Sequence, residues 1–423
     1  MKDISLSKSS KSLLWWGLYY VFLALLLLSW NDELNLPPMA YRYAFTALVI
    51  APLYITRSIY FPTILIFFVI LSAERHAVSY MMFKPMYISV VAIINNFLFR
   101  NVRANSVPPN LFWALLALCT ISDLMNNASF HDVTFILISI IIFSQYVVSD
   151  KHLHQVWKLS IIVLCLILSI DFHLNSKNFV QQMIVSGADY ERMGWRDPNY
   201  FGCILSVGGL LAYFEILDKN KGFIVRVINS LILGSISIAI ISMASRGAVL
   251  ALGTGIVLFT MLSDTGFKAK IVVSALVVTF IFFLLDSGYF DLLEARLMAD
   301  DGTGSGRTSI WQQKLNYFSN TDNPLFFLLG YGYEGGLQLG YGSNEVGFHN
   351  DFIAMLVEYG IVGFSLFVSL FIMLIKNVSN RIKVWSLTGA LLVTCMTLEP
   401  LTGGKFFFWF FLLYIYYIGH NHE

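Results

Sequence analysis

Long apolar stretches without a charged side chain are the feature that most constrains what this chain can fold into. The segments 13–30, 133–149 and 271–285 contain no Asp, Glu, Lys or Arg. Each is close to the ~20 residues that a helix needs to cross a bilayer. Lipid offers the backbone no hydrogen-bond partners, so such segments must be helical. The chain is 57% hydrophobic and only 13% charged, whereas soluble domains have about 25% charged residues.

The apolar pattern predicts an all-α, polytopic integral membrane protein with roughly 12 to 14 transmembrane helices, because short spans can be tilted or re-entrant. The first apolar run follows several lysines, as in a signal peptide, but no small-residue cleavage pattern follows Trp30, so a retained helix is expected. The expected helices lie at 13–30, 40–56, 59–73, 85–99, 110–125, 133–149, 159–172, 199–217, 227–244, 247–263, 271–286, 349–375, 384–399 and 406–419.

The connections between these helices alternate in charge. One set of short loops holds most of the Lys and Arg residues, and the positive-inside rule makes that side cytoplasmic. The other side has two long hydrophilic connections, 171–198 and 287–348. The second is expected to contain short helices, one of them at 307–318, and a loop of this length is usually functional. We therefore predict a single membrane domain with three sections, 1–286, 287–348 and 349–423.

Composition also narrows the chemistry. The net charge of +1 comes without the basic stripe that a nucleic-acid-binding protein needs, so no nucleic acid is expected as a partner. All four cysteines lie in apolar runs, which implies neither a disulfide framework nor a metal site. Asp300 and Asp301 could bind a divalent ion, but a solvated acidic pair is the favoured interpretation. No metal or other cofactor is expected.

Two arginines on the expected outer side are candidates for binding an anion. Arg246 lies between two apolar runs, where a charge is costly, although it could also snorkel to the interface. Arg307 begins an expected helix after a glycine-rich turn, where backbone amides and the helix N-terminus can face an anion. Alone it would usually be solvated. Because a guanidinium binds phosphate oxygens with a planar fork of donors, the pair suggests a diphosphate site.

His349 lies where the long outer loop turns into an apolar helix. A helix N-terminus disfavours the imidazolium ion, so this histidine should stay neutral near pH 7 and be able to accept a proton. A general base requires that property. The alternative is a histidine that only forms a hydrogen bond at the interface.

Four short motifs occur in the second half of the chain. The most informative is His349-Asn350, followed after nine residues by Gly360-x-x-Gly363. Directly after a long outer loop, this pattern resembles the signature of the bacterial O-antigen ligase and O-antigen polymerase family. The other three are similar to the family's Asn-bearing segment, its membrane-border arginine and its loop arginine: Arg196-Asp-Pro-Asn-Tyr-Phe-Gly202, Ser245-Arg246-Gly247 and Gly306-Arg307-x3-Trp311. The N-terminal half is similar only in its hydrophobicity.

The resemblance implies a metal-independent glycosyltransferase in a bacterial inner membrane, with its active site facing the periplasm. Its donor would be a glycan on undecaprenyl diphosphate, and its acceptor a second lipid-linked oligosaccharide. Arg246 and Arg307 would hold the diphosphate leaving group, and His349 would deprotonate the attacking hydroxyl. Besides the bilayer, a chain-length regulator is a further candidate partner. Residues expected to bind substrate are Arg42, Arg196, Asn199, Tyr331 and Asn350.

Three functions remain open at this point. An O-antigen polymerase is favoured by the aromatic content, 36 Phe and 21 Tyr, which is typical of the variable polymerases. An O-antigen ligase, which transfers finished polymer to the lipid A core, would use the same residues. A polysaccharide flippase should instead carry basic residues through the middle of several helices.

Several acidic residues have no assigned role at this stage. Glu358 lies inside an apolar helix beyond His349, where it needs a partner or a proton, and the sequence does not identify the partner. Asp123 and Glu399 lie near the outer ends of expected helices. They could shape the site or only contact lipid headgroups.

Overall fold

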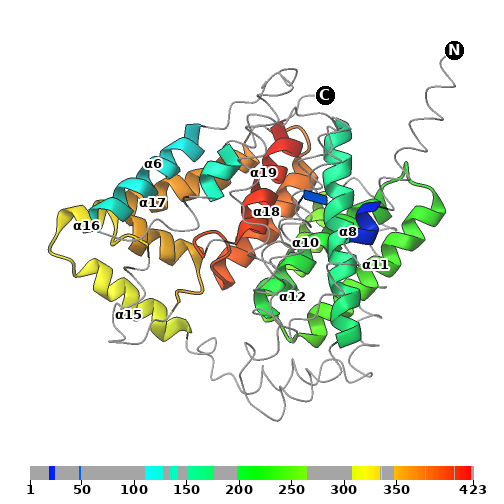
Figure 1. Cartoon of the computed structure of the whole chain (residues 1–423), viewed down its shortest axis with the longest axis horizontal. Coiled ribbons are helices and arrows are strands. Elements are labelled where there is room, and N and C mark those ends of the chain that lie inside the picture. Colours follow the sequence, from blue (N-terminus) through cyan, green and yellow to red (C-terminus); the bar gives the residue numbers. More distant parts are fainter. Residues whose placement is uncertain are drawn as a thin grey trace, which may run out of the picture.

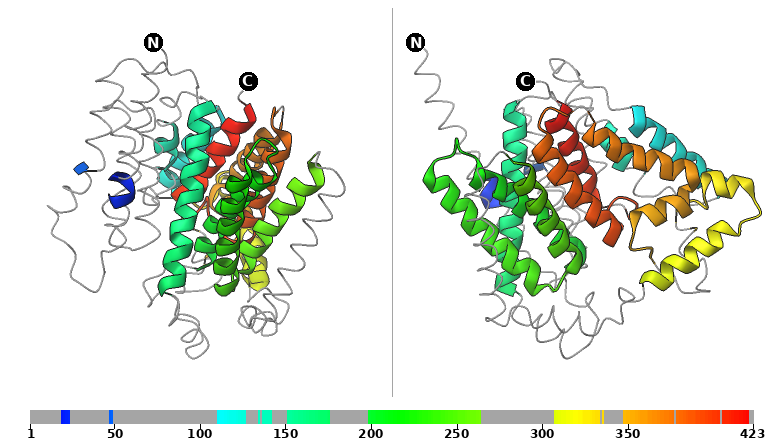
Figure 2. Two further views of the ribbon diagram at one scale, coloured as in Figure 1. Left: turned by 90° about the vertical axis from the view of Figure 1, so that its right-hand side faces the viewer. Right: turned by 180° about the vertical axis from the view of Figure 1, so that it is seen from behind.

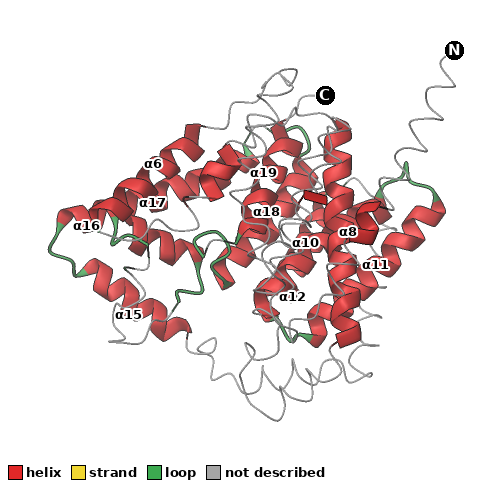
Figure 3. Cartoon of the chain, in the orientation of Figure 1, coloured by secondary structure: helices red, strands yellow, loops and turns green. Residues whose placement is uncertain are grey.

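The computed structural model describes residues 19–23, 47–48, 110–126, 134, 136–141, 151–175, 198–263, 307–333, 335, 347–376, 378–403 and 405–420. All regular structure in these ranges is helical (Figure 3), which confirms the prediction of an all-α polytopic membrane protein. The helices are α6 (Asn110–Met125), α8 (Lys151–Asn175), α10 (Pro198–Leu217), α11 (Phe223–Ser242), α12 (Arg246–Leu262), α15 (Arg307–Ser319), α16 (Pro324–Leu329), α17 (Asp351–Ile375), α18 (Arg381–Thr397) and α19 (Phe406–His420).

Most of the predicted helices in these ranges begin and end close to their expected residues. The exception is α8, which begins at Lys151 rather than at 159. The prediction was wrong there because Lys158 pairs with Glu215 of α10, so the helix continues through its basic residues. The predicted helices at 13–30, 40–56, 59–73, 85–99 and 271–286 lie outside the described residues, apart from a few positions in the first two, and of the predicted helix 133–149 only 134 and 136–141 are described.

Helix α16 is a short helix in the 287–348 connection, and it begins at the sequence Asn323-Pro324. Its start follows from those two residues: the Asn323 side chain accepts a hydrogen bond from the backbone N–H of Leu325 at 3.0 Å, and Pro324 occupies the first helical turn. Proline is well suited to that position because its fixed φ fits a helix and its missing N–H is not needed there.

Four of the described helical segments are long and apolar enough to cross a membrane: His154–Leu174, Asn199–Leu217, Phe223–Ser242 and Asp351–Ile375. Helices α6, α12 and α19 are apolar but shorter. Helix α15 is different, because it is polar over most of its length, as expected for a segment outside the hydrocarbon region.

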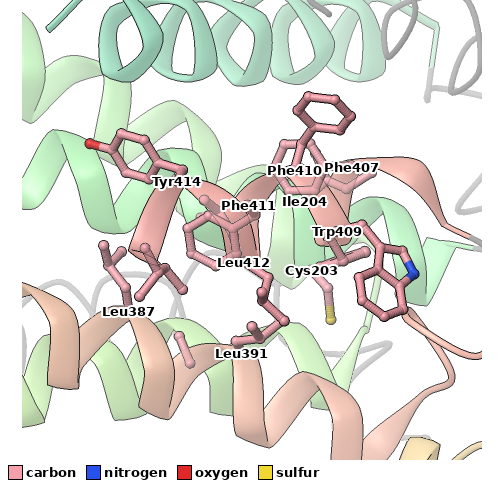
Figure 4. Close-up of a cluster of buried hydrophobic side chains, with 14 of the residues drawn as sticks. Cys203, Ile204, Leu387, Leu391, Phe407, Trp409, Phe410, Phe411, Leu412 and Tyr414 are labelled. Atoms are coloured by element: carbon pink, nitrogen blue, oxygen red, sulfur yellow. The ribbon is translucent and has the colours of Figure 1, made fainter. Parts of the chain in front are cut away.

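The described helices form two groups (Figures 1 and 2). Helices α8, α10, α11, α12, α18 and α19 make a bundle, and α6, α15, α16 and α17 form a wing beside it. Helix α19 lies among α8, α17 and α18. Its aromatic side chains pack between α10 and α18, where Phe411 and Leu412 lie near Cys203 and Leu391 (Figure 4), and all four are almost fully buried. Helix α19 has apolar side chains on every side, which accounts for their burial.

Helix α17 is interrupted at Gly360, which has a φ of +67°. A Cβ atom at this position would lie 2.3 Å from the carbonyl oxygen of Leu328 in α16. The chain after α16 is held against the same break, because the backbone N–H groups of Tyr331 and Gly332 donate to the carbonyls of Val357 at 3.1 Å and Glu358 at 2.8 Å. The wing is therefore fastened to α17 by backbone hydrogen bonds.

The two ends of the bundle differ in chemistry. At one end, Glu215 is paired with Lys158 and with Lys221, whose Nζ lies 3.2 Å from the second carboxylate oxygen. Helices α10 and α12 begin at the opposite end, and α18 finishes there. The candidate site described below lies at that opposite end.

Candidate functional site

The centre of the candidate site is the connection between α18 and α19, which we call the 398–405 loop. Its backbone is fixed to the start of α17 by Asp351, a fully buried residue. The Asp351 N–H donates to the Leu398 carbonyl at 3.2 Å. In return, the Asp351 carboxylate accepts from the N–H of Leu401 at 3.1 Å and from the N–H and hydroxyl of Thr402 at 2.7 and 2.6 Å. The loop is thus held in one position relative to α17.

His349 directly precedes the cap of α17 and has a φ of +50°. Its backbone N–H donates to the Glu399 carboxylate. On its other side, the Trp311 indole N–H donates to the carbonyl of Phe348 at 2.7 Å. A non-glycine residue in the left-handed region costs roughly 1–2 kcal/mol. Such conformations persist where the surrounding contacts over-determine them, often at functional sites.

Arg307 contacts Thr397, the last residue of α18, and Arg246 is next in sequence to a residue that packs against Thr397. Arg307 is the first residue of α15, and its Nη1 donates to the Thr397 carbonyl at 2.8 Å. Arg246 is the first residue of α12, and the residue after it, Gly247, packs so closely that a Cβ atom there would lie 2.7 Å from Thr397 Oγ1. The arginines and His349 are far apart in sequence, and all three lie around the junction of α18 with the 398–405 loop.

Asn350 caps helix α17. Its side-chain oxygen accepts from the N–H groups of Phe352 and Ile353 at 2.9 and 3.2 Å, and its amide nitrogen donates to the Met396 carbonyl at 3.2 Å. These bonds give Asn350 a structural role, since an N-cap asparagine satisfies helix N–H groups that have no partner within the helix. Contact between Asn350 and substrate stays a prediction.

Asn199 lies at the start of α10, next to residues that reach the site. The hydroxyl of Tyr200 accepts a hydrogen bond from the Glu399 N–H at 3.3 Å, and the Lys405 ammonium lies 4.7 Å from the centroid of the Tyr200 ring. This distance is typical of a cation–π contact. Asn199 and Tyr200 therefore lie at the edge of the site, and Lys405 brings a third positive charge there, which no sequence motif indicated.

The structure does not bring Tyr331 to this cluster. Tyr331 stacks on Phe326 with ring centroids 4.7 Å apart and meets the edge of Tyr317 at 5.8 Å. Tyr317 is in the last turns of α15, at the opposite end of that helix from Arg307. The remaining candidates, Arg42, Arg196 and the Asp300-Asp301 pair, lie outside the described residues.

Lys314 is fully buried beneath α15, with its ammonium 5.1 Å from the centroid of the Phe348 ring. Burial lowers the pKa of Lys314 to about 8, and the negative charges of Glu358 and Glu399 oppose that shift. Lys314 therefore lies close enough to Glu358 for the two charges to interact. The sequence could not identify it, because a lysine in a polar helix is normally solvated.

Glu399 belongs to the site, because it contacts His349 and Tyr200, whereas Asp123 lies in the wing. Burial of the Glu399 carboxyl raises its pKa to about 7, and the charge of Asp351 adds to this shift, whereas the hydrogen bond from His349 opposes it. The buried Asp123 carboxylate accepts from the Tyr333 N–H at 3.0 Å, which attaches α6 to the wing. In the described part of the chain, no group of three or more His, Cys, Asp or Glu residues could hold a metal ion.

The fold and the site define a helical membrane protein with a cluster of charged residues at one end of its bundle, on the side of a long polar segment. Residues 230–368 match the family described as O-antigen ligase, and the family resemblance is confirmed for this segment. The segment contains Arg246, Arg307 and His349, and it ends before the 398–405 loop. A search of curated proteins gave no match. This match supports an O-antigen ligase-like or polymerase-like function, that of a glycosyltransferase-like enzyme.

Proposed function

We propose that the protein is a polysaccharide polymerase of a bacterial inner membrane. It transfers a growing glycan from undecaprenyl diphosphate to the next lipid-linked repeat unit, with its active site at the periplasmic face. The observation that supports this proposal most directly is the position of Arg246, Arg307 and His349 around one point, the end of α18 at Thr397. Cations and a proton acceptor are the groups that displacement of a diphosphate requires.

In the proposed reaction, a hydroxyl oxygen of the acceptor sugar attacks the anomeric carbon of the donor. The bond from that carbon to the diphosphate oxygen breaks, and the diphosphate leaves on its lipid with the electron pair. Arg246 and Arg307 neutralise the negative charge that develops on the leaving group, a contribution that is large where the donors are preorganised. His349 accepts the proton of the attacking hydroxyl.

A ligase is the second candidate, favoured by the description of the matched family, O-antigen ligase. It would use the same donor and the same arginines, but its acceptor would be the lipid A core. The two functions therefore differ in the acceptor and not in the reaction that Arg246, Arg307 and His349 would carry out.

Deletion of the gene separates the two candidates when the lipopolysaccharide is examined by size. Without a polymerase, a separate ligase should still attach one unit, which gives core plus a single repeat. Without a ligase, bare core should appear while polymer accumulates on the carrier. Bare core would contradict the polymerase proposal, and an unchanged glycan profile would contradict both candidates.

The same deletion strain tests the site by complementation. The variants His349→Ala and Arg307→Lys should each reduce chain extension roughly 10²-fold or more, since a base or a bidentate cation is lost. Arg381→Lys is a matched control, because Arg381 is exposed at the start of α18, at the other end of the bundle. Normal extension by His349→Ala, at equal protein level, would remove the general-base role.

A further inference from the structure

A pocket of 820 Å³ lies in the wing, between the second half of α15, helix α16 and Tyr331. We infer that it binds sugar rings of the glycan substrate, at a subsite separate from the diphosphate site. The inference rests on the proposed function and adds a place where the glycan itself is recognised. Its volume is within the range of pockets that hold small organic ligands, roughly 300–1,000 Å³.

One wall of the pocket is a row of amide side chains on α15 and just beyond it. Gln313, Asn316 and Asn320 line the pocket and are exposed. Their spacing of three and four residues places them on one helix face. The opposite face carries Lys314 and Phe318, which are buried against the rest of the wing. Helix α15 thus presents to the pocket several groups that can both donate and accept hydrogen bonds.

The other wall is aromatic. Phe326 and Tyr331 are stacked with an angle of 27° between their planes, and the edge of Tyr317 meets Tyr331 at an angle of 61°. A sugar ring has C–H bonds on its faces and hydroxyl groups around its rim. An aromatic surface beside a row of amides can contact both parts of such a ring, because aromatic side chains offer a flat apolar face and amides bind hydroxyls.

The ionisable groups of the pocket argue against a phosphate ligand. Its lining contains Asp322 and two tyrosines but no Lys, Arg or His among the described residues. A diphosphate would find no cation to neutralise its charge there, whereas an uncharged polyhydroxyl ligand needs none. The chemistry therefore favours the sugar part of the substrate.

The pocket is held at a fixed distance from the reacting end. Tyr331 is hydrogen-bonded through its backbone to Val357 of α17, and α17 begins two residues after His349. Along α15, nine residues separate Arg307 from Asn316, which corresponds to about 14 Å at 1.5 Å per residue. A ligand that occupies both places must contain several linked sugars, so the subsite selects for an oligosaccharide over a single sugar.

Binding of a free oligosaccharide tests this inference without the lipid or the diphosphate. The probe is the oligosaccharide released by mild acid from the surface polysaccharide of the strain that carries the gene. Saturation-transfer NMR on the full-length protein in nanodiscs measures its affinity. Gln313→Ala should weaken binding roughly fivefold, as expected for a lost hydrogen bond, and Tyr331→Ala should weaken it more than Tyr331→Phe.

Gln312→Ala is the matched control, since Gln312 is an exposed neighbour of the same type that does not line the pocket. It should bind like the wild type. Equal affinity of the Gln312 and Gln313 variants, or no binding by the wild type, would overturn the inference. If the Gln313 variant alone is weakened while the deletion strain makes normal glycan, the subsite stands and the proposed polymerase function falls.

Discussion

At the scale of single residues, Glu399 connects more of the site than any candidate chosen from the sequence. Its carboxylate accepts from the backbone of His349, and its own N–H donates to Tyr200. The side chain of Glu399 also lies close enough to Asp351 and Lys314 for their charges to affect its pKa. Glu399 therefore positions His349 through a backbone hydrogen bond. The protonation of Glu399 depends on the other charged groups of the cluster.

The titration of Glu399 leads to a prediction about stability. Its pKa in the folded protein, about 7, lies above the ordinary value of 4.5, so the folded state holds the proton more tightly than the unfolded chain. The resulting stabilisation is complete below about pH 4.5 and is lost as the pH rises through about 7. The melting temperature of the wild type should therefore fall across this interval, and Glu399→Gln should flatten the fall while keeping an oxygen acceptor for His349.

Thermal unfolding in detergent at a series of pH values measures this difference. Lys314 does not affect this comparison, because its contribution to stability changes between about pH 8 and pH 10.5, above the interval in which Glu399 titrates. The same slope in the wild type and in Glu399→Gln would show that the Glu399 carboxyl does not titrate in this range.

At the scale of secondary structure, the break in α17 determines where the wing can attach. The two halves of α17 flank Gly360, and the backbone carbonyls just before the break accept hydrogen bonds from the chain that follows α16. Alanine at this position would need a left-handed conformation, which costs roughly 1–2 kcal/mol, and its Cβ would also contact the Leu328 carbonyl at 2.3 Å. No side chain can move to relieve a contact with backbone.

Gly360→Ala should therefore lower the melting temperature and reduce polysaccharide extension, since the wing would separate from α17. Gly234→Ala is the control, because no atom lies within 4 Å of a Cβ built at Gly234 in α11. There alanine should be neutral or slightly stabilising, as expected from helix propensities. Equal melting temperatures of the two variants would show that the break does not hold the wing.

The sequence predicted the apolar helices well because their length and the absence of charge follow directly from the bilayer. It also predicted a helix beginning at Arg307, from the glycines before it. It could not predict that residues of the 398–405 loop hold His349 and Asp351, since these contacts depend on how α17 and α18 pack. For the same reason the buried position of Lys314 was not predictable. Long-range contacts of single polar residues leave no periodic pattern.

At the scale of the whole molecule, the lysines around Glu215 and the candidate site lie at opposite ends of the bundle. Lys158 and Lys221 gather around Glu215 at one end, and Arg246, Arg307 and His349 lie at the other. The positive-inside rule assigns the first end to the cytoplasm. The candidate site would then face the periplasm.

Cysteine labelling tests this orientation, because the cysteines in the described part of the chain are all buried and should give little background. Asn320→Cys, beyond α15, should react with a membrane-impermeant maleimide in intact spheroplasts. Asn220→Cys, at the basic end, should react only after the membrane is permeabilised. The reverse pattern would place the candidate site in the cytoplasm and rule out transfer from a periplasmic donor.

The dependence of the site on the 398–405 loop has a consequence for biosynthesis. A ribosome completes Arg246, Arg307 and His349 before it makes Glu399, so a nascent chain carries all three candidates without the contacts that hold them together. Chains generally fold in the order of synthesis, and here the cluster can close only when α18 and α19 have both entered the membrane. An incomplete chain released into the bilayer would therefore be unable to act on the carrier lipid. The protein would become active only when α18 and α19 have been inserted.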